Sequence, residues 1–349
     1  MTHPATSHKA EYQHHIHVFR GIAIMLIVCA HTLPSLDWTG NPLLGRFLDS
    51  IANQSSIMFF FIAGYLFQHL SGRFDFRRYM QQKLRTVIVP YLILSIPALI
   101  VFTQLTRRTG LWSGFYDMPV WEQVFFFLIT GKHLAPLWFV PTITLFYLAA
   151  PLFLYVDRKF VRGYWAILPL LVLSAYIGRG GQLGPLNFAG YLLPVYLLGM
   201  AFSHYKDAAA GLVRRYAPLL VGVLLMAGAG FVLEWPSPPY WQMPMKVSMT
   251  LLLTVLLLRY ARRFGNRLDY VAEVSFGIFF IHAYFISAIK VATVYLLEGR
   301  IYTGEGEGGI PGNLFTFGVY AGTVLALSVV TLWVAKRLLG NRSRMFVGA

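Results

Sequence analysis

The chain is organised as long apolar runs separated by short polar stretches. A helix needs about 20 apolar residues to cross the roughly 30 Å of hydrocarbon in a bilayer. Runs of suitable length lie at 14–34, 51–70, 84–105, 134–156, 161–178, 186–204, 216–234, 243–260, 274–297 and 313–338. A further apolar stretch at 121–130 is too short to cross, and we expect it to lie in the interface or to re-enter. The pattern predicts an all-α polytopic membrane protein with about ten transmembrane helices.

The basic residues gather in alternate connections between these runs. Most of the 29 Lys and Arg residues lie before or just inside the first run, within 73–85, 158–162, 206–215 and 259–267, or after position 335. Acidic residues are concentrated in the other connections. By the positive-inside rule, this alternation places both termini in the cytoplasm and agrees with ten crossings. It also accounts for the net charge of +15 without a nucleic-acid partner.

Composition supports a membrane protein rather than a soluble one. The 349 residues are 57% hydrophobic and only 12% charged, whereas a soluble domain carries about 25% charged residues. No connection is long enough for a separate folded unit, so we expect one transmembrane domain over 1–349, with spans from 14 to 338 and no fused soluble domain. The single cysteine, Cys29, excludes an intramolecular disulfide and a cysteine-based metal site. We expect no metal.

Arg20 and His31 are the ionisable residues of greatest interest, because both lie in the first apolar run. Their spacing corresponds to roughly 1100° of helical rotation, or three turns plus about 20°, so both face the same way about 16 Å apart. Intramembrane ionisable groups suggest function by default. A neutral His31 could act as a base, and Arg20 could bind phosphate. The alternatives are a core histidine bonded to a neighbouring helix and a snorkelling arginine.

A second basic cluster opens the third run, with Arg77, Arg78, Lys83 and Arg85. Such a cluster usually sets topology and contacts lipid headgroups. Some of it could instead line the entrance for an acidic cofactor, and the spacing does not select which arginine would do so.

Two further side chains could contact a substrate. Trp138 could wall a binding site, although aromatic residues at the interface are ordinary anchors. His282 lies well inside the ninth run, two turns from Ser275, where an interhelical hydrogen bond is the default interpretation.

Several known signatures are absent from the sequence. It contains no G-x-S-x-G, no H-E-x-x-H and no G-x-x-x-x-G-K-[ST] motif. The apolar runs also contain almost no carboxylates, which argues against a transporter driven by cations or protons.

Segments distributed over nearly the whole chain match, in order, the motifs of one family. They are Phe19–Ala23 with His31, Met58–Leu66, Lys83–Tyr91, Leu137–Val140 with Tyr147 and Pro151, and Val274–His282. On these motifs the chain resembles membrane acyltransferase family 3, ten-helix proteins that O-acylate extracellular glycans and some small molecules. The resemblance implies that His31 is catalytic and that Arg20 supports the use of acyl-CoA.

The sequence departs from the family pattern at three places. The acidic residue that often precedes the arginine is absent, and His17-Val-Phe occupies that stretch. Ala63 stands where serine is usual, and Phe279 or Phe280 stands where tyrosine is common. The first departure leaves open what orients the catalytic pair.

Together, the residues and the resemblance predict an O-acetyltransferase of the bacterial inner membrane, surrounded by membrane lipids. Acetyl-CoA would be the acyl donor, and a hydroxyl of an exported polysaccharide or a lipid-linked glycan would be the acceptor. The alternatives are an acyltransferase for a small hydrophobic molecule such as an antibiotic, and a transporter or lipid flippase. The predicted site consists of His31 as base or acyl carrier, Arg20, Arg77, Arg78 and Arg85 at the phosphates, and Trp138 and His282 at the acceptor.

Overall fold

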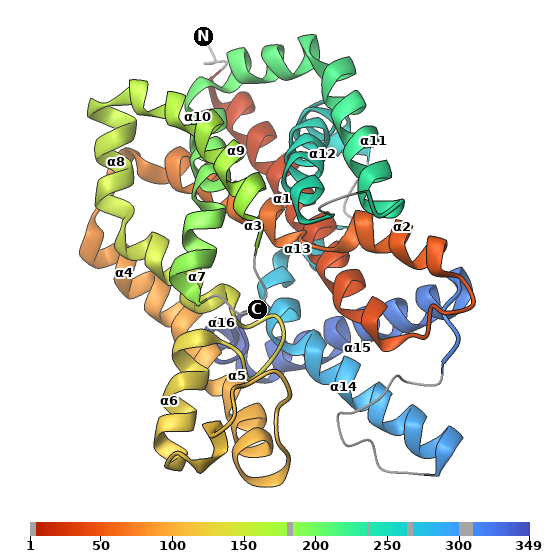
Figure 1. Cartoon of the computed structure of the whole chain (residues 1–349). Coiled ribbons are helices and arrows are strands. Elements are labelled where there is room, and N and C mark those ends of the chain that lie inside the picture. The colour runs from red at the N-terminus through yellow and green to blue at the C-terminus, as the bar shows by residue number, and fades with distance from the viewer. Residues whose placement is uncertain (1–4, 180–183, 236–237, 264–267, 300–309) are drawn as a thin grey trace.

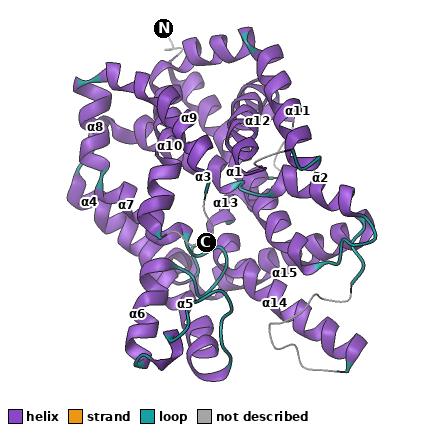
Figure 2. Ribbon diagram, viewed as in Figure 1, coloured by secondary structure: helices purple, strands orange, loops and turns teal. Residues whose placement is uncertain are grey.

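The computed structural model describes residues 5–179, 184–235, 238–263, 268–299 and 310–349. This part of the chain is almost entirely helical and contains no strand (Figures 1 and 2). The α-helices are α1 Ala5–Thr32, α2 Pro42–Ala52, α3 Ser56–Leu70, α4 Phe76–Lys83, α5 Val89–Ile100, α6 Val120–Thr130, α7 Phe139–Leu148, α8 Ala150–Lys159, α9 Ile167–Ile177, α10 Pro185–Arg215, α11 Ala217–Val232, α12 Pro238–Tyr260, α13 Asp269–Glu273, α14 Ser275–Glu298, α15 Leu314–Leu339 and α16 Ser343–Phe346.

Every apolar run found in the sequence is helical. Within the described residues, 7 helical segments are long and apolar enough to cross a membrane, or 8 if α7 and α8, bent by 52° at their junction, form one span. The shorter apolar helices are Val120–Thr130, Val161–Ile177 and Ala217–Val232. The first of these is the stretch that was too short to cross. The all-helical membrane fold is therefore confirmed, whereas ten crossings and cytoplasmic termini stay predictions.

Helix α1 lies at the centre of the packing. It contacts α3, α12, α13, α14 and α15, so the N-terminal span is surrounded by segments from most of the chain (Figure 1). Its Val18, Phe19, Ala23 and Ile24 are fully buried. Because Arg20 and His31 belong to this one unbroken helix, their separation is fixed by helical geometry.

Helices α3 and α10 pack backbone against backbone. A Cβ atom added at Gly64 would lie 2.0 Å from the carbonyl oxygen of Tyr196, and one added at Gly199 would lie 2.1 Å from that of Phe61. Only glycine permits this approach, as in other close pairs of membrane helices. The contact fixes the position of α3, which provides much of the wall of the cavity described below.

The third span is distorted at both ends of α5. Leu84–Ile88 and Val101–Leu105 are π-helical and flank it, so the chain from Phe76 to Leu105 is one long, uneven helix. Pro90 follows the first π turn and has no N–H to donate to the carbonyl of Thr86. A wider turn accommodates the proline ring, and such turns frequently mark functional sites.

The segment that follows α1 is hydrogen-bonded to the segment that precedes α15. The N–H of Asp37, after α1, donates to the carbonyl of Ile310, before α15, at 2.9 Å. Asp37 also forms an isolated bridge with Pro311, and the Trp38 ring packs on Phe317 at 6.3 Å. These contacts hold the end of α1 next to the beginning of α15.

Candidate active site

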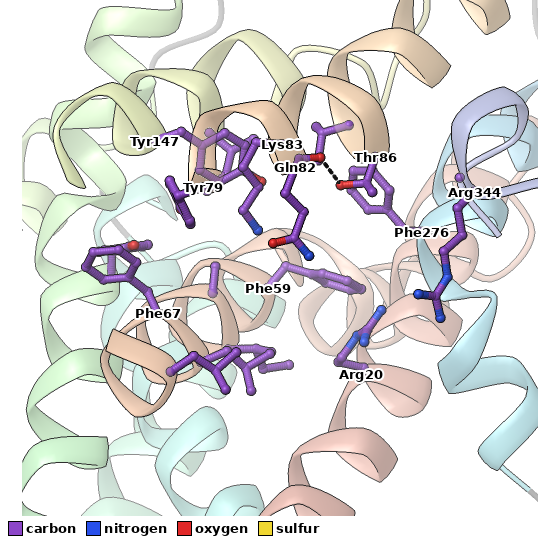
Figure 3. Close-up of a pocket in the computed structure, with 18 of the residues that line it drawn as sticks. Arg20, Phe59, Phe67, Tyr79, Gln82, Lys83, Thr86, Tyr147, Phe276 and Arg344 are labelled. Atoms are coloured by element: carbon purple, nitrogen blue, oxygen red, sulfur yellow. Dashed lines mark hydrogen bonds between the residues drawn. The ribbon is translucent and has the colours of Figure 1, made fainter. Parts of the chain in front are cut away.

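A cavity of about 800 Å³ lies among α1, α3, α4, α7 and the C-terminal segment (Figure 3). Four cationic side chains line it: Arg20, Arg78, Lys83 and Arg344. Figure 3 shows Arg20, Lys83 and Arg344 directed toward the same space. Arg20 is close enough to Lys83 and Arg344 for their like charges to repel one another. Such a cluster is stable when an anion lies between its members.

The carboxylates beside the cavity are already engaged. The side chain of Asp75 caps α4 by accepting a hydrogen bond from the backbone N–H of Arg78 at 2.7 Å. Glu273 accepts one from Lys336 at 2.6 Å, and this bond lowers the pKa of the Glu273 carboxyl. Neither carboxylate hydrogen-bonds any of the four cations through its side chain, so the cavity keeps an excess of positive charge.

Lys83 joins this cluster from the face of α4 that also carries Tyr79, one turn earlier. Lys83 is the last residue of α4, and Thr86 and Val87 of the π turn line the cavity with it. The ammonium of Lys83 lies 5.2 Å from the centre of the Tyr79 ring and 5.0 Å from that of Tyr147. These cation–π contacts hold the amine within the cavity.

Arg20 is held from α14. Its Nη2 donates a hydrogen bond to the side-chain Oγ of Ser275 at 3.0 Å. The remaining N–H groups leave it able to bind a phosphate through two donors.

The rest of the cavity wall is mainly apolar and aromatic. Phe59, Phe139 and Phe276 line it together with Ile143 and Ala63. A site with cations at one part and aromatic side chains at another suits an elongated ligand with a phosphate end and an apolar arm.

His31 does not line this cavity but lies against His282 of α14. The two ring centres are 5.3 Å apart. His31 is partly buried, whereas His282 is fully buried, and its Nδ1 lies 2.8 Å from the carbonyl oxygen of Ile278. Both predicted residues of the first span, Arg20 and His31, therefore contact α14, as their shared face predicted.

Aromatic rings connect the cavity with the histidine pair. The Phe139 ring lies 5.1 Å from Phe279, and Phe279 lies 6.3 Å from His282. Phe276, which lines the cavity, stacks on Phe279 at 6.0 Å. A single layer of aromatic side chains thus separates the cavity from the two imidazoles.

Arg179 stacks on Trp138 and lies close enough to His31 for its charge to act on that ring. The Arg179 guanidinium covers the Trp138 ring at 4.2 Å and lies 5.3 Å from the Phe188 ring. Its charge also acts on His31 and on Tyr191. Burial lowers the pKa of the Arg179 guanidinium, which still remains charged near neutral pH. Arg179 makes no ion pair with a carboxylate in the part of the chain that the structure describes.

The predicted site residues therefore fall into three groups. Arg20 and Arg78 line the cavity, and His31 and His282 meet beside it, with Trp138 near Arg179. Arg77 and Arg85 are exposed and do not line the cavity. Arg77 and Arg78 are neighbours on α4, and only Arg78 lines the cavity.

Sequence reasoning did not select Lys83, Arg344 or Arg179 as binding residues. Lys83 was visible in the basic cluster, but the rotation of α4 that turns it toward the cavity was not. Arg344 resembles the other C-terminal cations that follow the last span. Arg179 is distant in sequence from both Trp138 and His31, and no motif signals their contact.

Among the described residues, no group of three or more His, Cys, Asp or Glu side chains is placed to hold a metal ion. A family model described as an acyltransferase domain matches residues 13–333 of the chain. The search of curated proteins and the search of solved structures each returned no match.

Proposed function

Because this chain belongs to membrane acyltransferase family 3, we propose that it transfers an acetyl group from acetyl-CoA to a hydroxyl of a glycan at the bacterial inner membrane. The acceptor in this proposal is an exported polysaccharide or a lipid-linked sugar. Membership of the family supports a membrane acyltransferase, and acetyl-CoA as donor and a glycan as acceptor are our proposal.

One observation carries this proposal. A cavity with four cations lies one aromatic layer away from a pair of imidazoles, and the same helix holds Arg20 and His31. At about 1.5 Å per residue, the two are roughly 16 Å apart along α1. This distance is comparable to the reach between the phosphates of CoA and its thioester.

In the proposed complex, the CoA phosphates bind Arg20, Lys83 and Arg344, with Arg78 at the edge of the cavity. The pantetheine arm follows the apolar wall formed by Phe59, Phe139 and Phe276. Displacement of the aromatic layer then brings the thioester beside His31. Holding donor and base on one rigid helix supplies the orientation that acyl transfer requires.

The chemistry needs one base. A neutral nitrogen of His31 takes the proton of the acceptor hydroxyl as its oxygen forms a bond to the acyl carbon. The carbon–sulfur bond then breaks, and the CoA thiolate takes the proton back from His31. The products are the O-acyl ester and free CoA, and His31 returns to its neutral state.

The acceptor approaches from the side opposite the cations. His31 lies one residue before the end of α1, and the predicted topology places this end outside the cytoplasm. Arg179 and Trp138 lie beside His31 and offer a charged donor and an aromatic surface to the incoming sugar.

Replacement of His31 tests the proposed function directly. In purified protein supplied with radiolabelled acetyl-CoA, we expect His31→Ala to abolish release of CoA while leaving equilibrium binding of acetyl-CoA intact. Binding survives because the cations that contact the phosphates lie about three helical turns away.

His14→Ala provides the matched control, because His14 lies in the same helix but not near the histidine pair. We expect this variant to turn over acetyl-CoA at the wild-type rate. Equal turnover by His31→Ala would exclude His31 as the base, and failure of the wild-type protein to bind acetyl-CoA would exclude the donor.

A further inference from the structure

The hydrogen bonding of His282 fixes the state of its ring. Nδ1 lies 2.8 Å from the carbonyl oxygen of Ile278, one turn earlier in α14. A carbonyl oxygen only accepts, so Nδ1 must carry the proton. In the neutral ring, Nε2 then has a lone pair and no hydrogen, and can only accept a hydrogen bond.

That Nε2 atom is buried and has no hydrogen-bond partner among the described residues. The His282 side chain is fully buried in the middle of a predicted span. A buried acceptor without a donor is destabilising and uncommon in folded proteins. A role for the lone pair would explain why a histidine occupies this position.

His31 is the ring placed to use it. An imidazole nitrogen lies about 1.1 Å from its ring centre, so a nitrogen–nitrogen hydrogen bond of about 2.9–3.2 Å places the centres up to roughly 5.1–5.4 Å apart. The observed separation is 5.3 Å, with the ring planes inclined at 41°. Because Nδ1 of His282 stays bonded to the carbonyl of Ile278, rotation of the His31 ring is the movement that forms the bond.

We propose that His282 is the positioning residue of His31: Nε2 of His282 accepts a hydrogen bond from one ring nitrogen of His31 and leaves the other nitrogen free to act as the base. This inference rests on the proposed function and extends it, because it assigns His282 to the histidine rather than to the acceptor. It also answers what orients His31 in a chain that lacks an acidic residue before Arg20.

The hydrogen bond fixes the tautomer of His31 throughout the reaction. The N–H that faces His282 stays in place while the opposite nitrogen takes the hydroxyl proton and later returns it to the CoA thiolate. When His31 is briefly protonated, both of its nitrogens carry hydrogen, and the His282 lone pair stabilises the N–H directed at it. A neutral imidazole thus does the orienting work that a carboxylate does in a catalytic triad.

Two substitutions of His282 separate this role from packing. The side-chain oxygen of glutamine reaches the position of Nε2, whereas that of asparagine reaches only the position of Nδ1. His282→Gln keeps an acceptor for His31, and His282→Asn does not. Asparagine is one methylene smaller than glutamine, so the melting temperatures of both variants in detergent serve as the control for the difference in packing.

The first readout is carbethoxylation of His31 by diethyl pyrocarbonate, followed by peptide mass spectrometry. The reagent acylates a neutral, accessible imidazole nitrogen and requires no knowledge of the acceptor. We expect His282→Asn to slow modification of His31 by tenfold or more and His282→Gln to stay within about threefold of wild type. Acetyl-CoA turnover should follow the same order.

Equal rates in the two variants, whether both fast or both slow, would overturn the positioning role. Nitrogen-15 NMR of labelled histidine provides a second test, since the proposal requires that His282 has a protonated Nδ1 and an unprotonated Nε2. If the variants differ in His31 modification but the wild-type protein never consumes acetyl-CoA, the proposed function fails and the positioning role stands.

Discussion

Among the basic side chains near the cavity, small differences in position separate residues that line it from residues that do not. Arg77 and Arg78 are both exposed, but only Arg78 lines the cavity. Arg344 lines it from α16, and Arg342, two residues earlier, does not. These neighbours share the same local charge, so each pair forms a natural comparison between a cavity cation and a bystander.

We expect Arg344→Gln and Arg78→Gln to raise the KM for acetyl-CoA, because each removes a charge-assisted contact to a phosphate. A loss of about 1.5 kcal/mol corresponds to roughly a tenfold increase. Steady-state kinetics on the purified variants measure this change. Arg342→Gln and Arg77→Gln should leave the KM within about twofold of wild type, and an equal rise in all four variants would indicate a general effect of net charge.

At this scale the sequence was informative where one helix decides the geometry. The eleven-residue spacing of Arg20 and His31 predicted a shared face, and both side chains contact α14. It could not choose between Arg77 and Arg78, because that choice depends on the rotation of α4 relative to the cavity. The contact between His31 and His282 joins two helices far apart in sequence, and no periodicity within either helix encodes it.

At the scale of the elements, the pair α3 and α10 sets the shape of the cavity. Their backbones meet at Gly64 and Gly199, and α3 carries Phe59 and Ala63 of the cavity wall. A methyl group at Gly64 would overlap the carbonyl of Tyr196 and force the two helices apart.

Gly64→Ala should therefore destabilise the protein by about 1–3 kcal/mol or more and weaken acetyl-CoA binding as well. Thermal melting in detergent measures the first effect and equilibrium binding the second. Gly222→Ala in α11 is the control, since an added Cβ there meets nothing within 4 Å. If Gly64→Ala had the melting temperature of the wild-type protein, α3 and α10 would be able to move apart without loss of stability.

The existence of the helices followed from apolar runs, but their irregularities did not. The run 134–156 predicted one span, and the structure divides it into α7 and α8 with a bend of 52°. Pro151, at the start of α8, is the local signal for that bend. The π turn at Leu84–Ile88 is harder to foresee, because Pro90 is equally compatible with a simple kink.

On the scale of the whole molecule, the membrane topology decides which face each site meets. Our prediction of ten crossings places the connection after α5 outside and the connection after α8 in the cytoplasm. In a Cys29→Ser background, we expect Gly110→Cys to react with a membrane-impermeant maleimide in intact spheroplasts, and Lys159→Cys to react only after permeabilisation. Mass-shift labelling on a gel measures both.

Labelling of both positions in intact spheroplasts would contradict this topology. So would protection of Gly110→Cys together with labelling of Lys159→Cys, which would reverse the orientation. The charge alternation predicts ten crossings because it follows the order of charged residues along the chain, whereas helix length divides the described residues into 7 or 8 clear spans and three shorter helices.

The hydrogen bond between Arg20 and Ser275 joins residues 255 positions apart, which has a consequence for biosynthesis. When α1 enters the bilayer from the ribosome, α14 has not yet been translated. Arg20 then lacks its partner for most of the time that synthesis takes. Only late insertion of α14 supplies this hydrogen bond and brings Ser275 and His282 to α1. Nascent and truncated chains thus carry the proposed base, His31, without an assembled site, and we expect them not to consume acyl-CoA before the protein is complete.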